Sequence, residues 1–145
     1  MKTTTILLSI AASTLFSGCE KMMDCMDKHN NCEKSVLLNK GLYDNTSSAN
    51  YIITDAKISG DCLEVKFGSS GCDAKSWKVE LVDAESISES ATPQRSLKLA
   101  LTNSEMCTAA ISKSVSFDLT PLRIKGVSKV NLSLEGLNNQ ITYKY

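Results

Sequence analysis

The alternation of apolar and polar residues beyond residue 50 is the feature that most constrains how this chain of 145 residues can fold. A period of two places every second side chain on the same face of an extended strand. Glycine, proline and short polar stretches separate the alternating segments, which favours an all-β domain. The segments are residues 52–58, 63–67, 77–81, 97–101, 115–119, 130–134 and 141–145, with residues 107–111 as a candidate for one further short strand.

Strands with one apolar and one polar face need a second layer to cover the apolar side. We therefore predict an antiparallel, immunoglobulin-like β-sandwich of about seven strands over residues 51–145, with a sheet closed on itself as the alternative. Trp77 has the parity of the core positions, so we expect its ring inside the domain and not on a sugar-binding face. The polar segment 83–95 is expected to be a solvated crossover between sheets, with a recognition loop as the alternative.

The first 19 residues have the features of an export signal. Lys2 precedes an apolar run over residues 6–16, which is too short for a bilayer span of about 20 residues. The run leads through Ser17 and Gly18 to Cys19. This ending resembles the lipobox of bacterial lipoproteins, in which the cysteine thiol receives a diacylglycerol before cleavage. Phe16 stands where that family usually has an aliphatic residue.

The lipobox resemblance implies three parts: a cleaved signal peptide (1–18), a lipidated N-terminus and polar tether (19–50), and the β domain (51–145). It also implies a membrane partner, reached through the lipid on Cys19. Glu20 follows in place of the Asp that often retains lipoproteins at the inner membrane, so we expect the outer membrane. An ordinary signal peptide cut nearby is the alternative.

The β-rich pattern is also similar to that of small uncharacterised lipoproteins of Gram-negative bacteria such as the Bacteroidota. The runs that carry this likeness are SFDLTPL at 116–122 and ITYKY at 141–145. The resemblance implies no particular activity.

Five cysteines remain once Cys19 is assigned to the lipid. Disulfides form and persist in the compartments that exported proteins reach, and an odd number leaves one thiol over. We predict a local Cys25–Cys32 bond, closed by a turn at residues 29–31, and a long-range Cys72–Cys107 bond. Cys62 is then the candidate free thiol.

Few residues indicate catalysis. His29 is the only histidine and lies in the predicted tether, where a catalytic group could not be held rigidly. No nucleophile elbow, phosphate-binding loop, dinucleotide fingerprint or HExxH motif occurs. We expect neither enzyme activity nor a cofactor, and keep a small enzyme or enzyme inhibitor as an alternative.

Met22, Cys25, Met26 and His29 fall on one face of a helical turn and are soft ligands of the kind that copper(I) prefers. A copper site is therefore one alternative, although a short amphipathic turn is the favoured interpretation. The chain has 16 basic and 16 acidic residues, which gives no attraction for nucleic acid. We expect a binding or structural module whose partner is an unknown protein or a glycan.

Overall fold

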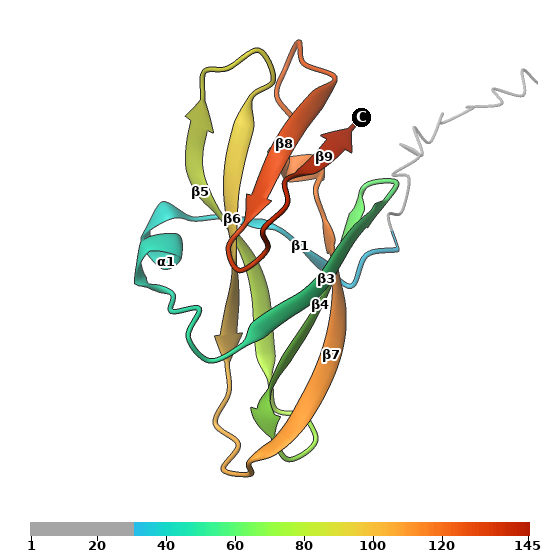
Figure 1. Ribbon diagram of the computed structural model, residues 1–145. Helices are drawn as coiled ribbons and strands as arrows, with labels where there is room; N and C mark the ends of the chain where they lie inside the picture. The colour runs from blue at the N-terminus through green and yellow to red at the C-terminus, as the bar shows by residue number, and fades with distance from the viewer. Residues whose placement is uncertain (1–30) are drawn as a thin grey trace, which may run out of the picture.

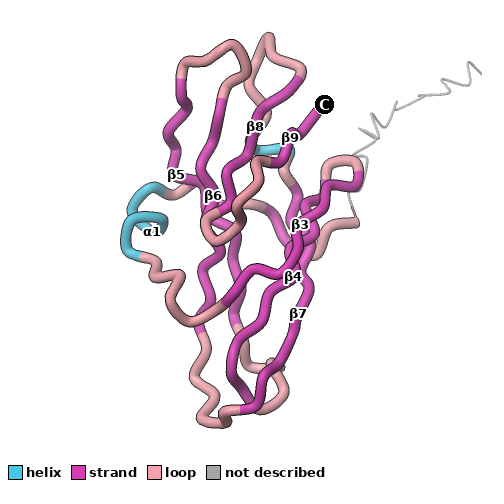
Figure 2. The backbone as a smooth tube through the Cα atoms, in the orientation of Figure 1, coloured by secondary structure: helices cyan, strands magenta, loops and turns pink. Residues whose placement is uncertain are grey.

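Two β-sheets face each other in the computed structural model, which describes residues 31–145 (Figures 1 and 2). Sheet A has the strand order β1-β7-β4-β3, and sheet B the order β2-β5-β6-β8-β9. The strands are β1 (Lys34–Ser35), β2 (Leu37–Leu38), β3 (Ile52–Ser59), β4 (Cys62–Gly71), β5 (Lys78–Ser88), β6 (Gln94–Thr102), β7 (Ala109–Asp118), β8 (Lys129–Leu134) and β9 (Ile141–Lys144). A helix, α1 (Lys40–Asn45), and a 3-10 turn, η1 (Thr120–Leu122), complete the elements.

The prediction of an all-β domain is confirmed, but the prediction that all its strands are antiparallel is wrong. The pairs β1–β7, β2–β5 and β6–β8 are parallel. The chain leaves β6 for β7 in the other sheet and returns to β8, and a crossover of this kind brings a strand back in its original direction. The alternation pattern identifies strands but carries no information about their relative direction.

All seven segments predicted by alternation are strands. The further candidate at residues 107–111 joins the 115–119 segment in one long strand, β7. The glycine-rich residues 68–71, expected to interrupt the chain, continue β4 to Gly71. The prediction that residues 83–95 form a solvated crossover between the sheets is wrong. β5 runs on to Ser88, β6 begins at Gln94, and the two strands pair antiparallel within sheet B, so only residues 89–93 form a loop.

Apolar side chains from both sheets form a single core. Phe67 and Phe117 of sheet A are completely buried, as are Leu81, Leu99 and Tyr143 of sheet B. Trp77 is 5% exposed, as its parity predicted, and its ring centroid lies 6.0 Å from that of Phe67. The polar faces point outward on both sides, as expected for two layers that cover each other.

The segment that precedes β3 belongs to the domain from residue 34, whereas residues 19–50 were predicted to form a tether. β1 pairs with β7 in sheet A, and β2 pairs with β5 in sheet B. Val36 lies between these two strands and is 3% exposed. β1 and β2 have only two residues each, which is too few for an alternating pattern to be recognised in the sequence.

Helix α1 lies over the outer face of sheet B, beside β5 (Figure 1). Asn39 caps its first turn by accepting a hydrogen bond from the Leu42 amide. Lys98, on the outer face of β6, donates to the carbonyl oxygens of Tyr43 and Thr46, both at 3.2 Å. This buried lysine therefore holds the helix against the sheet.

No helix within residues 31–145 is long and apolar enough to cross a membrane.

Candidate functional site

Disulfides fix both ends of β4. Cys62, its first residue, is bonded to Cys32 with the Cα atoms 5.6 Å apart. Cys72, which follows its last residue, is bonded to Cys107 with the Cα atoms 4.9 Å apart. The Cys72–Cys107 prediction is confirmed.

The predictions of a Cys25–Cys32 bond and a free Cys62 thiol are wrong. Pairing of β1 and β4 with the same strand decides the partner of Cys32, because Ser35 and Cys62 both lie opposite Asp118 of β7. The start of the described chain is thereby brought to the start of β4. Cys25 was predicted as the partner of Cys32 because the two are close in the sequence. The contact between Cys32 and the start of β4 depends on strand pairing, which the alternation of apolar residues does not reveal.

Several predicted site residues lie outside the described residues. These are the predicted lipidation site Cys19 and the candidate copper ligands Met22, Cys25, Met26 and His29. Within residues 31–145, no three His, Cys, Asp or Glu side chains are grouped so that they could hold a metal ion.

We call the end of the domain that holds Cys32, the β3–β4 turn, and the loops 89–93 and 119–128 the near end (Figure 1). Asp61 of the turn accepts hydrogen bonds from Tyr143 (2.6 Å) and from Arg123 (2.5 Å). Burial, reinforced by the Asp61 carboxylate, raises the pKa of Tyr143 to about 12. This cluster joins the two sheets and positions the 119–128 loop.

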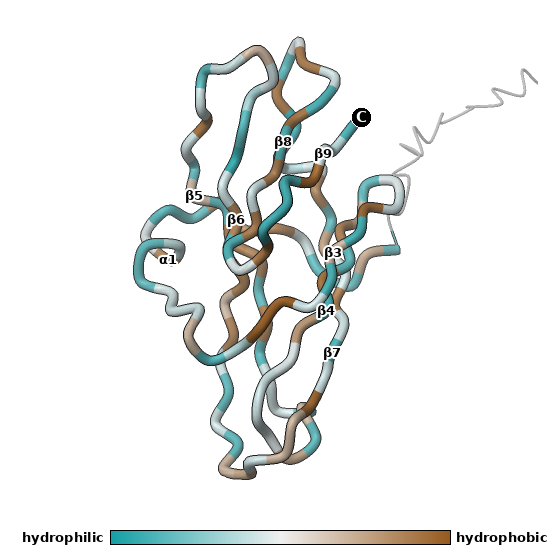
Figure 3. The backbone as a smooth tube through the Cα atoms, in the orientation of Figure 1, coloured by the Kyte–Doolittle hydropathy of each residue, from teal (hydrophilic) through white to brown (hydrophobic). Residues whose placement is uncertain are grey.

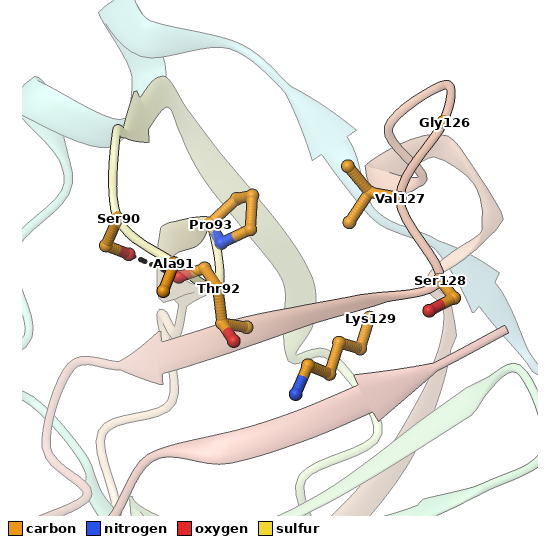
Figure 4. A pocket seen from close by; sticks show the side chains of 8 residues that line it. All are labelled: Ser90, Ala91, Thr92, Pro93, Gly126, Val127, Ser128 and Lys129. Atoms are coloured by element: carbon orange, nitrogen blue, oxygen red, sulfur yellow. Dashed lines mark hydrogen bonds between the residues drawn. The ribbon is translucent and has the colours of Figure 1, made fainter.

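A cavity of about 410 Å³ opens at the near end, between the 89–93 loop and the chain that enters β8 (Figure 4). Pro93 and Val127 face each other across it, and the Lys129 side chain extends toward the Thr92 side. The Ser90 hydroxyl donates to the Thr92 carbonyl within the loop. Hydroxyl groups, an ammonium group and apolar carbons therefore line this cavity. Its lining residues are Ser90, Ala91, Thr92, Pro93, Gly126, Val127, Ser128 and Lys129.

A larger hollow of about 590 Å³ lies on sheet A, where β3, β4 and β7 run side by side; we call it the sheet A groove. The outward positions here are occupied by small residues, among them Gly68, Ser70 and Ala110, which leave a depression in the outer surface of the sheet. Ile52 lies directly opposite Gly68 and is 73% exposed. The start of β3 is among the most hydrophobic stretches of the described chain (Figure 3), and it combines the exposed Ile52 with the buried Ile53.

We call the opposite end of the domain, which holds the β4–β5 and β6–β7 loops, the far end. The Glu105 carboxylate joins these two loops. Glu105 accepts hydrogen bonds from the backbone amides of Cys72 (2.5 Å), Asp73 (3.2 Å) and Ala74 (3.3 Å), and from the Ser76 hydroxyl (2.7 Å). These bonds, led by the one from Ser76, lower the pKa of Glu105 to about 2. With the Cys72–Cys107 bond beside it, this contact joins the β4–β5 and β6–β7 loops.

Aromatic rings contribute little to the surface of residues 31–145. Trp77, Tyr51 and Tyr143 are buried, while Tyr43 and Tyr145 are half-buried. The large apolar residues that are exposed in this part of the chain are aliphatic or methionine. The described surface therefore lacks the open aromatic platform on which sugar rings stack.

These features define a disulfide-linked, all-β protein of two mixed sheets. No family model and no curated protein matches the chain. Two solved structures are similar in fold. One is a protein of unknown function, described as DUF1344, from Bacteroides vulgatus, with a TM-score of 0.50 and 21% identity over 77% of this chain and 55% of that one.

The second structure, from Parabacteroides distasonis, is provisionally named a toxin-related protein. It has a TM-score of 0.52 and 16% identity over 77% of this chain and 59% of that one. The chain thus spans little more than half the length of either structure. At these identities the likeness shows the fold alone, in proteins of two Bacteroidota species.

Proposed function

We propose that this chain is a lipid-anchored protein of the bacterial outer membrane, without enzyme activity, whose two-sheet domain binds another protein. Two disulfides within residues 31–145 support export, because such bonds persist in oxidising compartments. The proposed lipid on Cys19 precedes Cys32 by 13 residues, a stretch that reaches at most about 45 Å. The anchor would therefore keep the near end close to the membrane and leave the far end accessible.

The sheet A groove is the observation that carries the binding part of the proposal. Its apolar rim residue Ile52 is 73% exposed and shares the groove with Ala110 and Ile111 of β7. Contiguous exposed apolar surface of this kind is typical of protein contact sites. Small outward residues let a partner's backbone approach the sheet closely. A protein partner is favoured over a glycan because no aromatic platform lies on the described surface.

Site-specific photo-crosslinking in the native membrane tests the binding surface. A photoreactive residue in place of Ser112, in the groove, is expected to give an adduct of discrete mass that Ile52→Asp abolishes. The control places the same group at Ser133, an exposed position of β8 in the other sheet. Adducts at neither position, or the same adducts at both, would count against the proposal.

Anchoring is tested separately by growing cells with an alkyne-bearing fatty acid. The full-length chain is expected to carry the label and to sediment with outer membranes, whereas Cys19→Ala is expected to lose the label. Equal labelling of both chains would rule out Cys19 as the anchor.

Copper binding is the second candidate function, and the disulfide pattern favours it in one respect. Because Cys32 is bonded to Cys62, the predicted Cys25–Cys32 bond does not form, and a Cys25 thiol would be a further soft ligand beside Met22, Met26 and His29. Copper(I) titration against a competing chelator tests this. An affinity unchanged in Cys25→Ser/His29→Ala would end the hypothesis.

We also infer that the two sheets are a variant of the immunoglobulin-like sandwich. The described domain has the size of that fold, and its first segment divides its pairing between both sheets. An experimental structure with an antiparallel β6–β8 pair, or with the sheets closed into one, would contradict this topology.

A further inference from the structure

Two lysines face each other at the near end of sheet B. In the antiparallel pair of β8 and β9, Lys129 lies directly opposite Lys144, and both side chains are exposed. Like charges directly opposite on one face destabilise a sheet. Among residues 31–145, neither lysine forms an ion pair that would offset the repulsion.

Charge is unevenly distributed even though the whole chain is balanced. Residues 119–145 contain four basic residues and one acidic residue, Glu135. Glu135 is paired with Lys98, and Arg123 is paired with Asp61. The cations of this segment that remain without an ion pair to a described residue are Lys125, Lys129 and Lys144.

The outer face around the two lysines offers amides and hydroxyls. Asn131 and Thr142 form the next cross-strand pair on this face and are hydrogen-bonded at 3.0 Å, and Gln140 donates to Gln94 at 3.1 Å. Lys129 also lines the near-end cavity with Ser90, Thr92 and Ser128 (Figure 4). Ammonium and hydroxyl groups are the donors that suit phosphate oxygens.

Three carboxylates belong to the segments at the near end: Asp61 in the β3–β4 turn, Glu89 in the 89–93 loop and Asp118 at the end of β7. Asp61 binds Arg123 and Tyr143, and Asp118 accepts from Thr120. Glu89 precedes the cavity residue Ser90 in the 89–93 region. Among the ion pairs within residues 31–145, none joins a carboxylate to Lys125, Lys129 or Lys144.

The described start of the chain lies at this same end. Cys32 is bonded to Cys62, and the adjacent Asp61 contacts Arg123, two residues before Lys125, and Tyr143, the neighbour of Lys144. A lipid on Cys19, 13 residues before Cys32, would bring these lysines within reach of headgroups. We propose that Lys125, Lys129 and Lys144 dock the near end onto phosphate headgroups of the membrane that holds the anchor. This inference rests on the proposed lipid anchoring.

Lysine protection on vesicles tests the docking. The mature acylated chain is reconstituted into vesicles of phosphatidylcholine alone or mixed with phosphatidylglycerol, and treated with a water-soluble amine reagent. Peptide mass spectrometry then gives the labelling of each lysine relative to Lys78, an exposed lysine at the opposite end of sheet B. We expect labelling of Lys129 and Lys144 to fall several-fold on the anionic vesicles only, and to recover in 1 M salt, where charges are screened within about 3 Å.

Variants and outcomes separate the two proposals. In Lys129→Gln/Lys144→Gln the protection of Lys125 on anionic vesicles is expected to be lost, whereas the matched control Lys78→Gln keeps it. A chain that floats with neither kind of vesicle contradicts the anchor, and the docking with it. If the chain floats with both kinds of vesicle but Lys129 and Lys144 are labelled as strongly as Lys78, the docking alone is overturned. The docking is also overturned if these lysines are protected equally on neutral and anionic vesicles. Protection by inorganic phosphate without vesicles would identify a site for the free anion and overturn the membrane as its source.

Discussion

Asp83 and Arg95 form a two-pronged ion pair that is closed off from solvent. Arg95 Nε lies 3.0 Å from Asp83 Oδ2, and Arg95 Nη2 lies 2.7 Å from Asp83 Oδ1. Asp83 is 0% exposed and Arg95 6%. The pair sits where the β5–β6 register shifts, and Asp83 also accepts the amide of Glu85, a residue with φ of 53°. It therefore fixes an irregular stretch of sheet B.

Removing one partner of this pair should destabilise the domain strongly. We expect Asp83→Ala to lower the free energy of unfolding by about 3–5 kcal/mol, because it leaves a buried guanidinium without its counter-charge. The apolar double variant Asp83→Leu/Arg95→Met should recover much of that loss. Urea unfolding measures both effects.

An exposed ion pair supplies the control for that experiment. Asp55→Ala breaks the Asp55–Lys57 contact on β3, and such solvated pairs contribute at most about 1 kcal/mol. If Asp83→Ala cost no more than Asp55→Ala, the buried pair would not have the structural role assigned to it.

Glu105 should make the domain sensitive to acid. Its pKa of about 2 in the folded protein is below the ordinary 4.5, so the folded state favours the ionised carboxylate. The resulting stabilisation is complete above pH 4.5 and is lost as the pH falls from about 4.5 to about 2. In Glu105→Gln this part of the pH dependence should disappear.

Denaturant unfolding between pH 2 and pH 7 measures this difference. Asp55 and Asp73 also have lowered pKa values, each held mainly by a hydrogen bond to a neighbouring lysine, so the variant is compared with the parent chain at every pH. Parallel stability curves for the two chains would contradict the assigned role of Glu105.

Gly71 is required by close packing and not by its backbone angles. A Cβ at this position would lie 2.5 Å from Glu105 Oε2 and 2.8 Å from Trp77 Cζ2. We expect Gly71→Ala to lower the free energy of unfolding by about 1–3 kcal/mol, as overpacking typically does. Gly68→Ala in the same strand, whose Cβ would meet only the Ile111 carbonyl at 3.6 Å, should have a clearly smaller effect in the same thermal or urea assay.

The strands and most of their inward positions could be predicted from the sequence, because alternation directly records which face of a strand is buried. β3 is the exception: the register shifts between Ile53 and Asp55, so Ile53 is buried and Ile52, which alternates with the half-buried Ala56 and Ile58, is exposed. Trp77 was placed in the core on parity alone, and Cys72–Cys107 followed from two flanking turns. Register and strand direction could not be predicted, because they depend on which strands meet. The parallel pairing of β6 with β8 and the Cys32–Cys62 bond both depend on pairing between strands that are distant in the sequence.

The candidate surfaces were missed for a similar reason. Lys129 and Lys144 each stand in an ordinary alternating strand, and only the β8–β9 register brings them opposite each other. The groove likewise needs Gly68 of β4 beside Ile52 of β3. A surplus of basic residues after position 119 was the one available signal in the sequence.

The lysine pair gives a prediction about stability that is independent of any membrane. Lys144→Glu replaces a repulsive cross-strand contact with an attractive one opposite Lys129. We expect it to raise the free energy of unfolding by roughly 0.2–1 kcal/mol at low salt, and by less at high salt. Lys78→Glu is the matched control. A loss of stability in Lys144→Glu that exceeds the control would mean that the two charges do not face each other as described.

The intact mass of the protein purified from cell envelopes, read together with its non-reduced peptide map, tests the central claim most directly. We expect an N-terminus at an acylated Cys19 and a peptide in which Cys32 is joined to Cys62. An unacylated chain that still begins at Met1, with these cysteines as thiols, would contradict both the anchoring and the export on which the proposed function depends.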